Sequence, residues 1–146
     1  MAYWDTACLV KLYVVESDSA VFRMHVRNGA TVVTCEIARM ELWTAFRRKE
    51  AVGDLGSGGA RAALDAFDDD VSAGRVVVNS LDSATDSEFE TLIETCYTKA
   101  PPVLLRTLDA IHLAAARTSQ ETEIVTTDGR MRAAAPLLGF SLFPVP

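Results

Sequence analysis

The stretch "TEIVTTDGRM", residues 122–131, places an aspartate directly after a short run of β-branched residues. Isoleucine, valine and threonine are typical of strands, and aspartate is a good residue to begin a helix. The segment that follows, "DGRMRAAAPLLG" at 128–139, predicts a short helix that Pro136 bends. The stretch therefore predicts a strand that ends just before Asp128 and leads into a helix.

The same order of strand and helix recurs along the chain. Short apolar or β-branched runs predict further strands at 2–6, 30–34, 75–80 and 140–145. Helical patterns fill the intervals at 7–16, 17–29, 35–52, 60–74, 83–100 and 107–116. Strands that alternate with helices imply a mostly parallel sheet with helices on both faces. We therefore expect residues 1–146 to form a single α/β domain.

The composition narrows the functional classes. Hydrophobic residues make up 49% of the chain, but no apolar run is long enough to span a bilayer. The N-terminus lacks the basic region of a secretory signal, so we expect a cytoplasmic protein that does not enter a membrane. Three cysteines without a CxxC pair predict reduced, packed thiols. The net charge of −6 disfavours nonspecific binding of nucleic acid, unless the acids gather in a pocket that binds cations.

An aspartate interrupts the apolar helix "TLDAIHLAAA", residues 107–116. At about 100° per residue, Asp109 lies on the same stripe as Leu105 and Leu113. A buried carboxylate without a partner is costly. Asp109 therefore either caps or pairs locally, or distant parts of the chain bring charges and a cation to it.

Two further aspartates follow strands that are distant in the sequence. Asp5 ends the first strand and Asp128 follows the strand at 122–127. In an open α/β sheet, ligands bind outside the carboxyl ends of the strands, so these two carboxylates can meet at one edge. Each of them alone is equally compatible with an ordinary helix cap.

Glu41 has a setting like that of Asp109. The helical count places it between Ile37 and Ala45, on a largely apolar arc. The alternative is an exposed glutamate that pairs with a neighbour such as Arg48. If all four carboxylates met, they would repel one another unless a cation compensated their charge. Mg²⁺ and Mn²⁺ prefer carboxylate oxygens, and either ion can activate water and polarise a phosphodiester.

Four segments together resemble the PIN domain family, in particular the VapC toxin ribonucleases of VapBC toxin/antitoxin pairs. They are "WDTACLVKLY" at 4–13, "CEIARMELWTAFRRK" at 35–49, "LRTLDAIHLAAA" at 105–116 and "TEIVTTDGRM" at 122–131. The resemblance covers nearly the whole chain and rests on the order and spacing of these segments. It implies a PIN-like three-layer α/β/α fold.

The resemblance also implies a site and a function. Asp5, Glu41, Asp109 and Asp128 would be metal ligands or water activators, and Thr6 and Thr126 would be supporting hydroxyls. The chain would be a Mg²⁺- or Mn²⁺-dependent endoribonuclease acting as the toxin of a toxin/antitoxin pair. Its partners would be an RNA substrate, a VapB-type antitoxin and a second copy in a homodimer.

Other residues have competing interpretations. The basic run Arg47, Arg48 and Lys49 is either an RNA-backbone contact or a solvated helix end, since cations suit a helix C-terminus. We expect His112 to serve in packing or in a local hydrogen bond. The rival function is a noncatalytic module, either a receiver-like phosphoacceptor that binds Mg²⁺ or a partner-binding domain. A phosphoacceptor needs a lysine near one central aspartate, and the sequence indicates none.

Overall fold

A five-stranded sheet forms the centre of the molecule. A computed structural model describes residues 2–145 of the chain. Its strands are β1 (Ala2–Trp4), β2 (Val32–Cys35), β3 (Val76–Asn79), β4 (Glu123–Val125) and β5 (Ser141–Phe143). They lie in the order β3-β2-β1-β4-β5, and each neighbouring pair is parallel. The predicted parallel α/β sheet is confirmed, and it contains no antiparallel pair among these strands.

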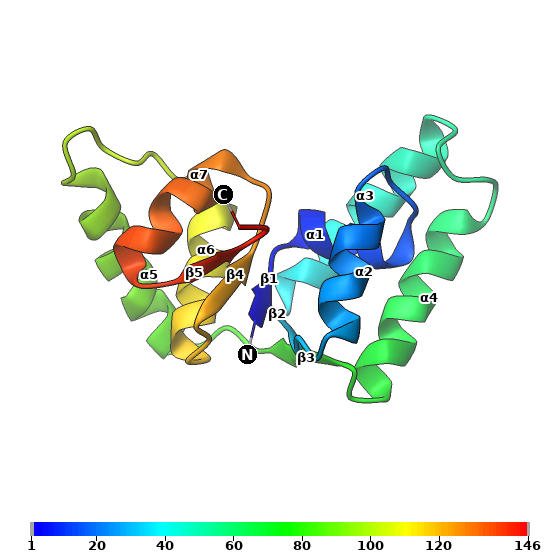
Figure 1. Cartoon of the computed structure of the whole chain (residues 1–146), viewed down its shortest axis with the longest axis horizontal. Coiled ribbons are helices and arrows are strands. Elements are labelled where there is room, and N and C mark those ends of the chain that lie inside the picture. Colours follow the sequence, from blue (N-terminus) through cyan, green and yellow to red (C-terminus); the bar gives the residue numbers. More distant parts are fainter. Residues whose placement is uncertain (1, 146) are drawn as a thin grey trace.

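Helices cover both faces of this sheet. One layer contains α1 (Thr6–Tyr13), α2 (Ser19–Arg27), α3 (Ile37–Ala51) and α4 (Gly59–Ser72). The other contains α5 (Ser83–Tyr97), α6 (Thr107–Thr118), α7 (Gly129–Ala134) and the 3₁₀ helix η1 (Ala135–Leu138). Figure 1 shows α1 to α4 on one side of the strands and α5 to α7 on the other. The three-layer arrangement predicted from the sequence is thus confirmed.

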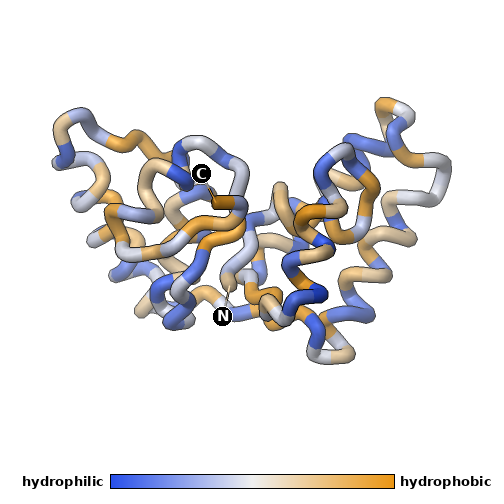
Figure 2. Tube along the Cα trace, viewed as in Figure 1, coloured by the Kyte–Doolittle hydropathy of each residue, from blue (hydrophilic) through white to orange (hydrophobic). Residues whose placement is uncertain are grey.

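Alternation along the strands divides the core between the two layers. In β1, Trp4 packs against the side covered by α1 to α4, where Leu42 and Phe67 also lie. Its neighbour Tyr3 packs on the opposite side with Leu113 and other residues of α5 to α7. Successive strand residues face opposite sides of a sheet, so each face receives its own hydrophobic cluster. Along the helices, hydrophobic and hydrophilic residues alternate, as expected for elements that bury one side (Figure 2).

Element boundaries differ from the prediction by a few residues. The helix predicted from Cys35 begins at Ile37, because Cys35 still pairs with Asn79 as the last residue of β2. The segment predicted as one bent helix at 128–139 is α7 followed by η1, and Pro136 lies within η1. A proline lacks an amide hydrogen, so the α-helical ladder cannot continue through it.

The strand order creates a switch point beside β1. The chain first adds β2 and β3 on one side of β1, then returns to add β4 and β5 on the other. Ligands of open α/β sheets bind outside the carboxyl ends of the strands at such a point. Both Asp5, after β1, and Asp128, after β4, lie there.

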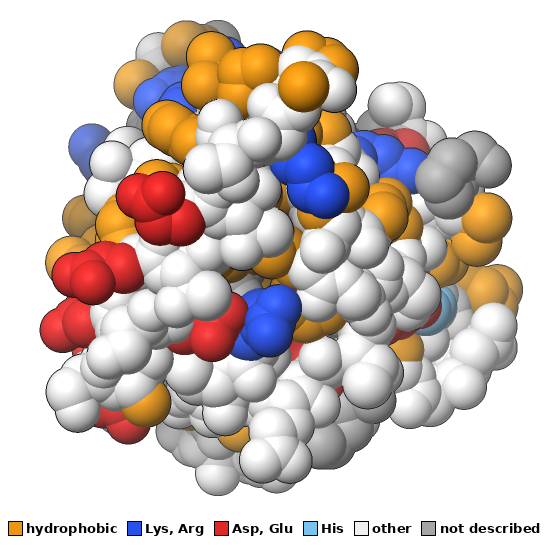
Figure 3. All heavy atoms as spheres, turned by 90° about the vertical axis from the view of Figure 1, so that its left-hand side faces the viewer, with side chains coloured by type: hydrophobic (Ala, Val, Ile, Leu, Met, Phe, Trp, Pro, Cys, Tyr) orange, Lys and Arg blue, Asp and Glu red, His pale blue; other side chains and the backbone are white. Residues whose placement is uncertain are grey.

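The outer surface has exposed acidic side chains and also exposed hydrophobic ones such as Val15 and Met40. Asp86, Glu90 and Glu94 are exposed on α5. Figure 3 views the molecule from the side of α5 and shows acidic side chains on the left and a group of hydrophobic side chains at the top. Among the described residues, no helix has the length and hydrophobicity needed to cross a membrane. The three cysteines are buried free thiols, as predicted.

Candidate active site

Asp5 is held at the end of β1 by three hydrogen bonds. Its Oδ1 accepts from the backbone amide of Cys8 at 2.8 Å, which caps α1, and its Oδ2 accepts from the hydroxyl of Thr126. The backbone amide of Asp5 donates to the carbonyl of Val125 at 3.1 Å, which ties it to β4. Burial raises the pKa of the Asp5 carboxyl, and the bonds from Thr126 and Cys8 oppose that rise. Asp5 is therefore both a helix cap and a rigid, buried acid.

Thr126 links Asp5 to Asp128. Its hydroxyl donates to Asp5 and accepts from the backbone amide of Asp128 at 3.0 Å. The Oδ1 of Asp128 in turn accepts from the amides of Arg130 and Met131 at 2.8 and 3.1 Å, so it caps α7. The capping interpretation of both aspartates is thus correct, but it leaves one carboxylate oxygen of Asp128 free of backbone contacts.

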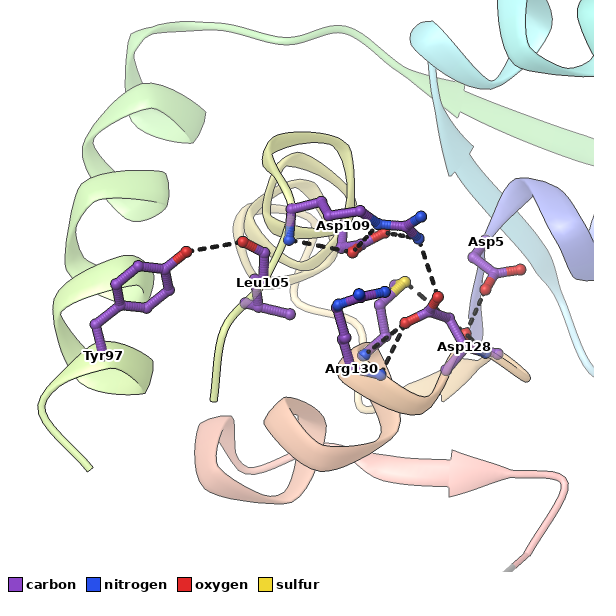
Figure 4. A network of polar contacts seen from close by, with 9 residues as sticks. Asp5, Tyr97, Leu105, Asp109, Asp128 and Arg130 are labelled. Carbon is purple, nitrogen blue, oxygen red and sulfur yellow. Dashed lines mark hydrogen bonds and ion pairs between the residues drawn. The ribbon is translucent and has the colours of Figure 1, made fainter. Parts of the chain in front are cut away.

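Asp109 and Asp128 are joined by one arginine. The Nη2 atom of Arg106 donates to Asp109 Oδ1 at 3.1 Å and to Asp128 Oδ2 at 3.0 Å. Its Nε donates to Asp109 Oδ2 at 2.9 Å, and its backbone amide donates to the same oxygen at 3.2 Å. Figure 4 shows Asp109 and Asp128 pointing toward each other, with Asp5 to one side. Asp109 thus pairs locally and also faces an acid from a distant segment.

Glu41 is bound by a buried histidine. His112 Nε2 lies 2.7 Å from Glu41 Oε2, and the hydroxyl of Thr6 donates to the same oxygen. The other ring nitrogen of His112 lies 2.9 Å from the hydroxyl of Tyr3. His112 is buried, as expected for a packing residue, but its hydrogen bond to Glu41 is not local, because Glu41 lies on α3, 71 residues away.

Electrostatics favour a charged pair of Glu41 and His112. Burial alone would lower the pKa of His112, but its contacts with Cys35 and Glu41 outweigh burial and raise the pKa to about 10. Burial would likewise raise the pKa of Glu41, but the hydrogen bonds from His112 and Thr6 and the charge of His112 lower it. With both groups ionised, each ring N–H of His112 donates, one to Glu41 and one to Tyr3.

Two connected hollows lie beside these acids. A groove of about 670 Å³ is lined by Thr6, Ala7, Val10, Ile37, Met40, Glu41, Thr44, Ala45, Arg48, Arg106 and Leu108. A smaller cavity of about 390 Å³ is lined by Glu41, Arg106, Thr107, Leu108 and Asp109. Glu41 and Arg106 border both. Of the four candidate acids, Glu41 is the one that lines the groove, and Asp109 lines the smaller cavity.

The candidate metal-binding acids lie in one region, but their side chains do not converge on a single point. Within residues 2–145, no three His, Cys, Asp or Glu side chains lie near enough to one another to bind one ion in this arrangement. A positively charged nitrogen, Nη2 of Arg106, already bridges two carboxylates at about 3 Å. The guanidinium thus stands in for a cation between Asp109 and Asp128. The donor set, carboxylates and hydroxyls, is the one that Mg²⁺ and Mn²⁺ prefer.

The basic run 47–49 does not form one surface. Arg47 pairs with Glu50, and Lys49 lies 2.6 Å from Glu16. Only Arg48 of the three lines the groove beside Glu41. These contacts follow from the 3.6-residue period of α3, which points three consecutive side chains in different directions.

A family model for the PIN domain matches residues 2–136. The chain belongs to the PIN domain family. It is 30% identical over 148 residues to ribonuclease VapC35 of Mycobacterium tuberculosis, covering 97% of this chain and 95% of that protein. It is 32% identical over 142 residues to ribonuclease VapC46 of the same organism, covering 96% and 94%.

A solved structure shows the same PIN fold. VapBC2 from Rickettsia felis, bound to a DNA fragment from its promoter, matches with a TM-score of 0.69 and 14% identity over 97% of each chain. The resemblance to VapC-type PIN domains is confirmed by these relatives. Their names agree with the prediction of an RNA-hydrolysing enzyme.

Proposed function

We propose that this PIN domain is a divalent-metal-dependent endoribonuclease that acts as the toxin of a toxin/antitoxin pair. The observation that carries the proposal is the bridge between Asp109 and Asp128, where one cationic nitrogen contacts both carboxylates. Asp5 is joined to this pair through Thr126, and Glu41 borders the same cavity as Asp109. Relatives named as ribonucleases support RNA as the substrate.

In the proposed site, Asp5, Glu41, Asp109 and Asp128 would hold Mg²⁺ or Mn²⁺. When bound, the ion would neutralise charge on the scissile phosphate and lower the pKa of a water molecule. Thr126 fixes the carboxylate of Asp5, while Thr6 and His112 fix that of Glu41. The reaction would be hydrolysis by water, without a covalent intermediate on the enzyme.

RNA would approach through the groove. Arg48 and Arg106 line it and can contact phosphates, whereas exposed acids on α5 make that face unfavourable for a polyanion. Unstacked bases are the readable ones in RNA, so a single-stranded or loop segment fits best. A few local cations and the bound metal would offset the net charge of −6.

The proposed protein partners are a VapB-type antitoxin and a second copy of the chain. The similar protein from Rickettsia felis was solved as VapBC2 bound to a promoter DNA fragment, which supports a VapB-type antitoxin as a partner. The groove beside Glu41 exposes apolar side chains such as Met40 and Leu108, which suits a peptide segment. We expect the complex in the cytoplasm, where its RNA substrate would be found.

The phosphoacceptor alternative lacks a lysine in the right place. Lys11 is bound to Glu16 and Asp18, and Lys49 is bound to Glu16. Lys99 is exposed in the segment after α5. Incubation with a small phosphoryl donor should therefore leave the intact mass unchanged.

The test of the nuclease is cleavage of single-stranded RNA by the purified chain. We expect cleavage with Mg²⁺ or Mn²⁺, none in excess EDTA, and a loss of at least about a hundredfold in Asp5→Asn, since removal of one essential group costs this much or more. Asp68→Asn is the matched control, because Asp68 pairs with Arg39 away from the groove. Cleavage by folded Asp5→Asn at the wild-type rate, or full activity in EDTA, would contradict the proposal.

A further inference from the structure

Arg106 has an unusual set of partners for an exposed side chain. It precedes α6 and its side chain is 61% exposed, yet its guanidinium makes three charged contacts with two acids. Asp109 is three residues further along the chain, and Asp128 is 22 residues away. Both acids belong to the proposed metal site. The cation that holds them together is therefore part of the protein itself.

We propose that Arg106 is a displaceable internal counter-ion that competes with the divalent metal for Asp109 and Asp128. The inference rests on the proposed function, because it assumes that these carboxylates bind a metal. It adds a role for a residue outside the four acids, in which metal loading requires the guanidinium to leave. Arg106 thereby sets the metal concentration at which the site fills.

The Arg106 guanidinium and a metal ion cannot easily bind the same two carboxylates at once. Nη2 of Arg106 lies at 3.1 and 3.0 Å from one oxygen of each acid, and Nε takes the second oxygen of Asp109. A metal ligated by these oxygens would lie in contact with the guanidinium. Two positive charges at that distance repel each other, and the carboxylate lone pairs are shared between them. The two cations therefore exclude each other.

Moving the Arg106 guanidinium away from the two acids requires little free energy. Both ion pairs of Arg106 are reached by solvent on the arginine side, and exposed pairs of this kind stabilise a protein only weakly. The backbone amide of Arg106 can still donate to Asp109 Oδ2, which caps the start of α6, when the side chain leaves. Arg106 borders both the groove and the smaller cavity, so the released guanidinium has open space to enter. The start of α6 need not change.

The test is titration of the full chain with Mn²⁺ alone by calorimetry at low salt. We expect Arg106→Gln to bind Mn²⁺ about three- to tenfold more tightly than wild type, because two weak ion pairs no longer compete. Arg106→Lys keeps the charge without the two-pronged geometry and should lie between them. The gain should shrink at high salt, because salt screens exposed charges.

Arg39→Gln is the matched control. Arg39 makes a two-bonded pair with Asp68, also exposed, and its loss changes the net charge by the same amount. Its Mn²⁺ affinity should stay within about twofold of wild type, as expected for a distant exposed charge. Equal or weaker binding by Arg106→Gln, with wild-type binding intact, would overturn the inference alone. If neither wild type nor Arg106→Gln binds Mn²⁺, both the proposed metal site and the inference are overturned.

Discussion

Replacing His112 with glutamine removes a buried positive charge next to Glu41 while keeping an N–H donor. His112 is 3% exposed, and its pKa is raised to about 10 from the ordinary 6.5. A raised pKa in the folded state means that the proton stabilises the fold. This stabilisation is fully present below pH 6.5 and is lost as the pH rises toward 10.

The pH window has an acid limit set by Glu41. Its pKa is lowered in the folded protein, so its contribution is present above the ordinary value of 4.5 and is lost as the pH falls. The difference between wild type and His112→Gln should therefore be largest near pH 5 to 6.5. A charge-assisted hydrogen bond contributes about 1.5–3 kcal/mol, which corresponds to a fall in melting temperature of about 3–12 °C.

The assay is urea denaturation of both proteins from pH 5 to 9.5 in EDTA, so that no divalent ion contributes. Wild type should lose stability steadily above pH 6.5, and His112→Gln should not. Tyr3→Phe keeps the histidine charge and should retain the wild-type slope. Repeating the comparison in a Cys35→Ser background separates the share of that thiol, which lies 3.8 Å from the ring. Parallel pH profiles for wild type and His112→Gln would refute the charged pair.

Two further predictions concern the hydroxyl link and the RNA path. Thr126→Val removes the group that joins Asp5 to Asp128, so we expect a loss of about 1–3 kcal/mol of unfolding free energy in urea and weaker Mn²⁺ binding by calorimetry; unchanged values for both would show that the link is dispensable. Arg48→Gln should reduce the slope of log K for single-stranded RNA against log salt by about 0.7, whereas Lys49→Gln, whose side chain is held in an ion pair, should not. If the salt slope of Arg48→Gln equals that of wild type, the RNA does not contact Arg48 and must bind elsewhere.

The layered fold could be predicted because each local pattern agreed with the global one. Short β-branched runs separated by helices permit little else than a parallel sheet, and the structure has that arrangement. Boundaries were less accurate because they depend on pairing. Cys35 belongs to β2 because Asn79 pairs with it, and no local property of the sequence around Cys35 contains that information.

The four acids were assigned to the candidate site by two different kinds of reasoning. Asp5 and Asp128 follow from topology alone, because the carboxyl ends of parallel neighbours β1 and β4 meet at one edge. Glu41 and Asp109 lie on helices, where periodicity predicted only an acid in an apolar setting. Their assignment to the same site came from the resemblance to PIN domains. Their role as metal ligands remains a prediction.

The residues that sequence reasoning missed are the ones that balance the charge of these acids. A local signal existed for Arg106, because it precedes Asp109 by three residues, the spacing of a helical ion pair. No such signal links Arg106 to Asp128 or His112 to Glu41, since those contacts are made across the fold. A carboxylate in an apolar stripe predicts that a compensating charge exists but not which residue supplies it. Here a buried histidine compensates Glu41 permanently, whereas an exposed arginine compensates Asp109 and Asp128. Of these two cations, the exposed arginine is the one that we propose a metal can displace, because its guanidinium is reached by solvent whereas His112 is buried.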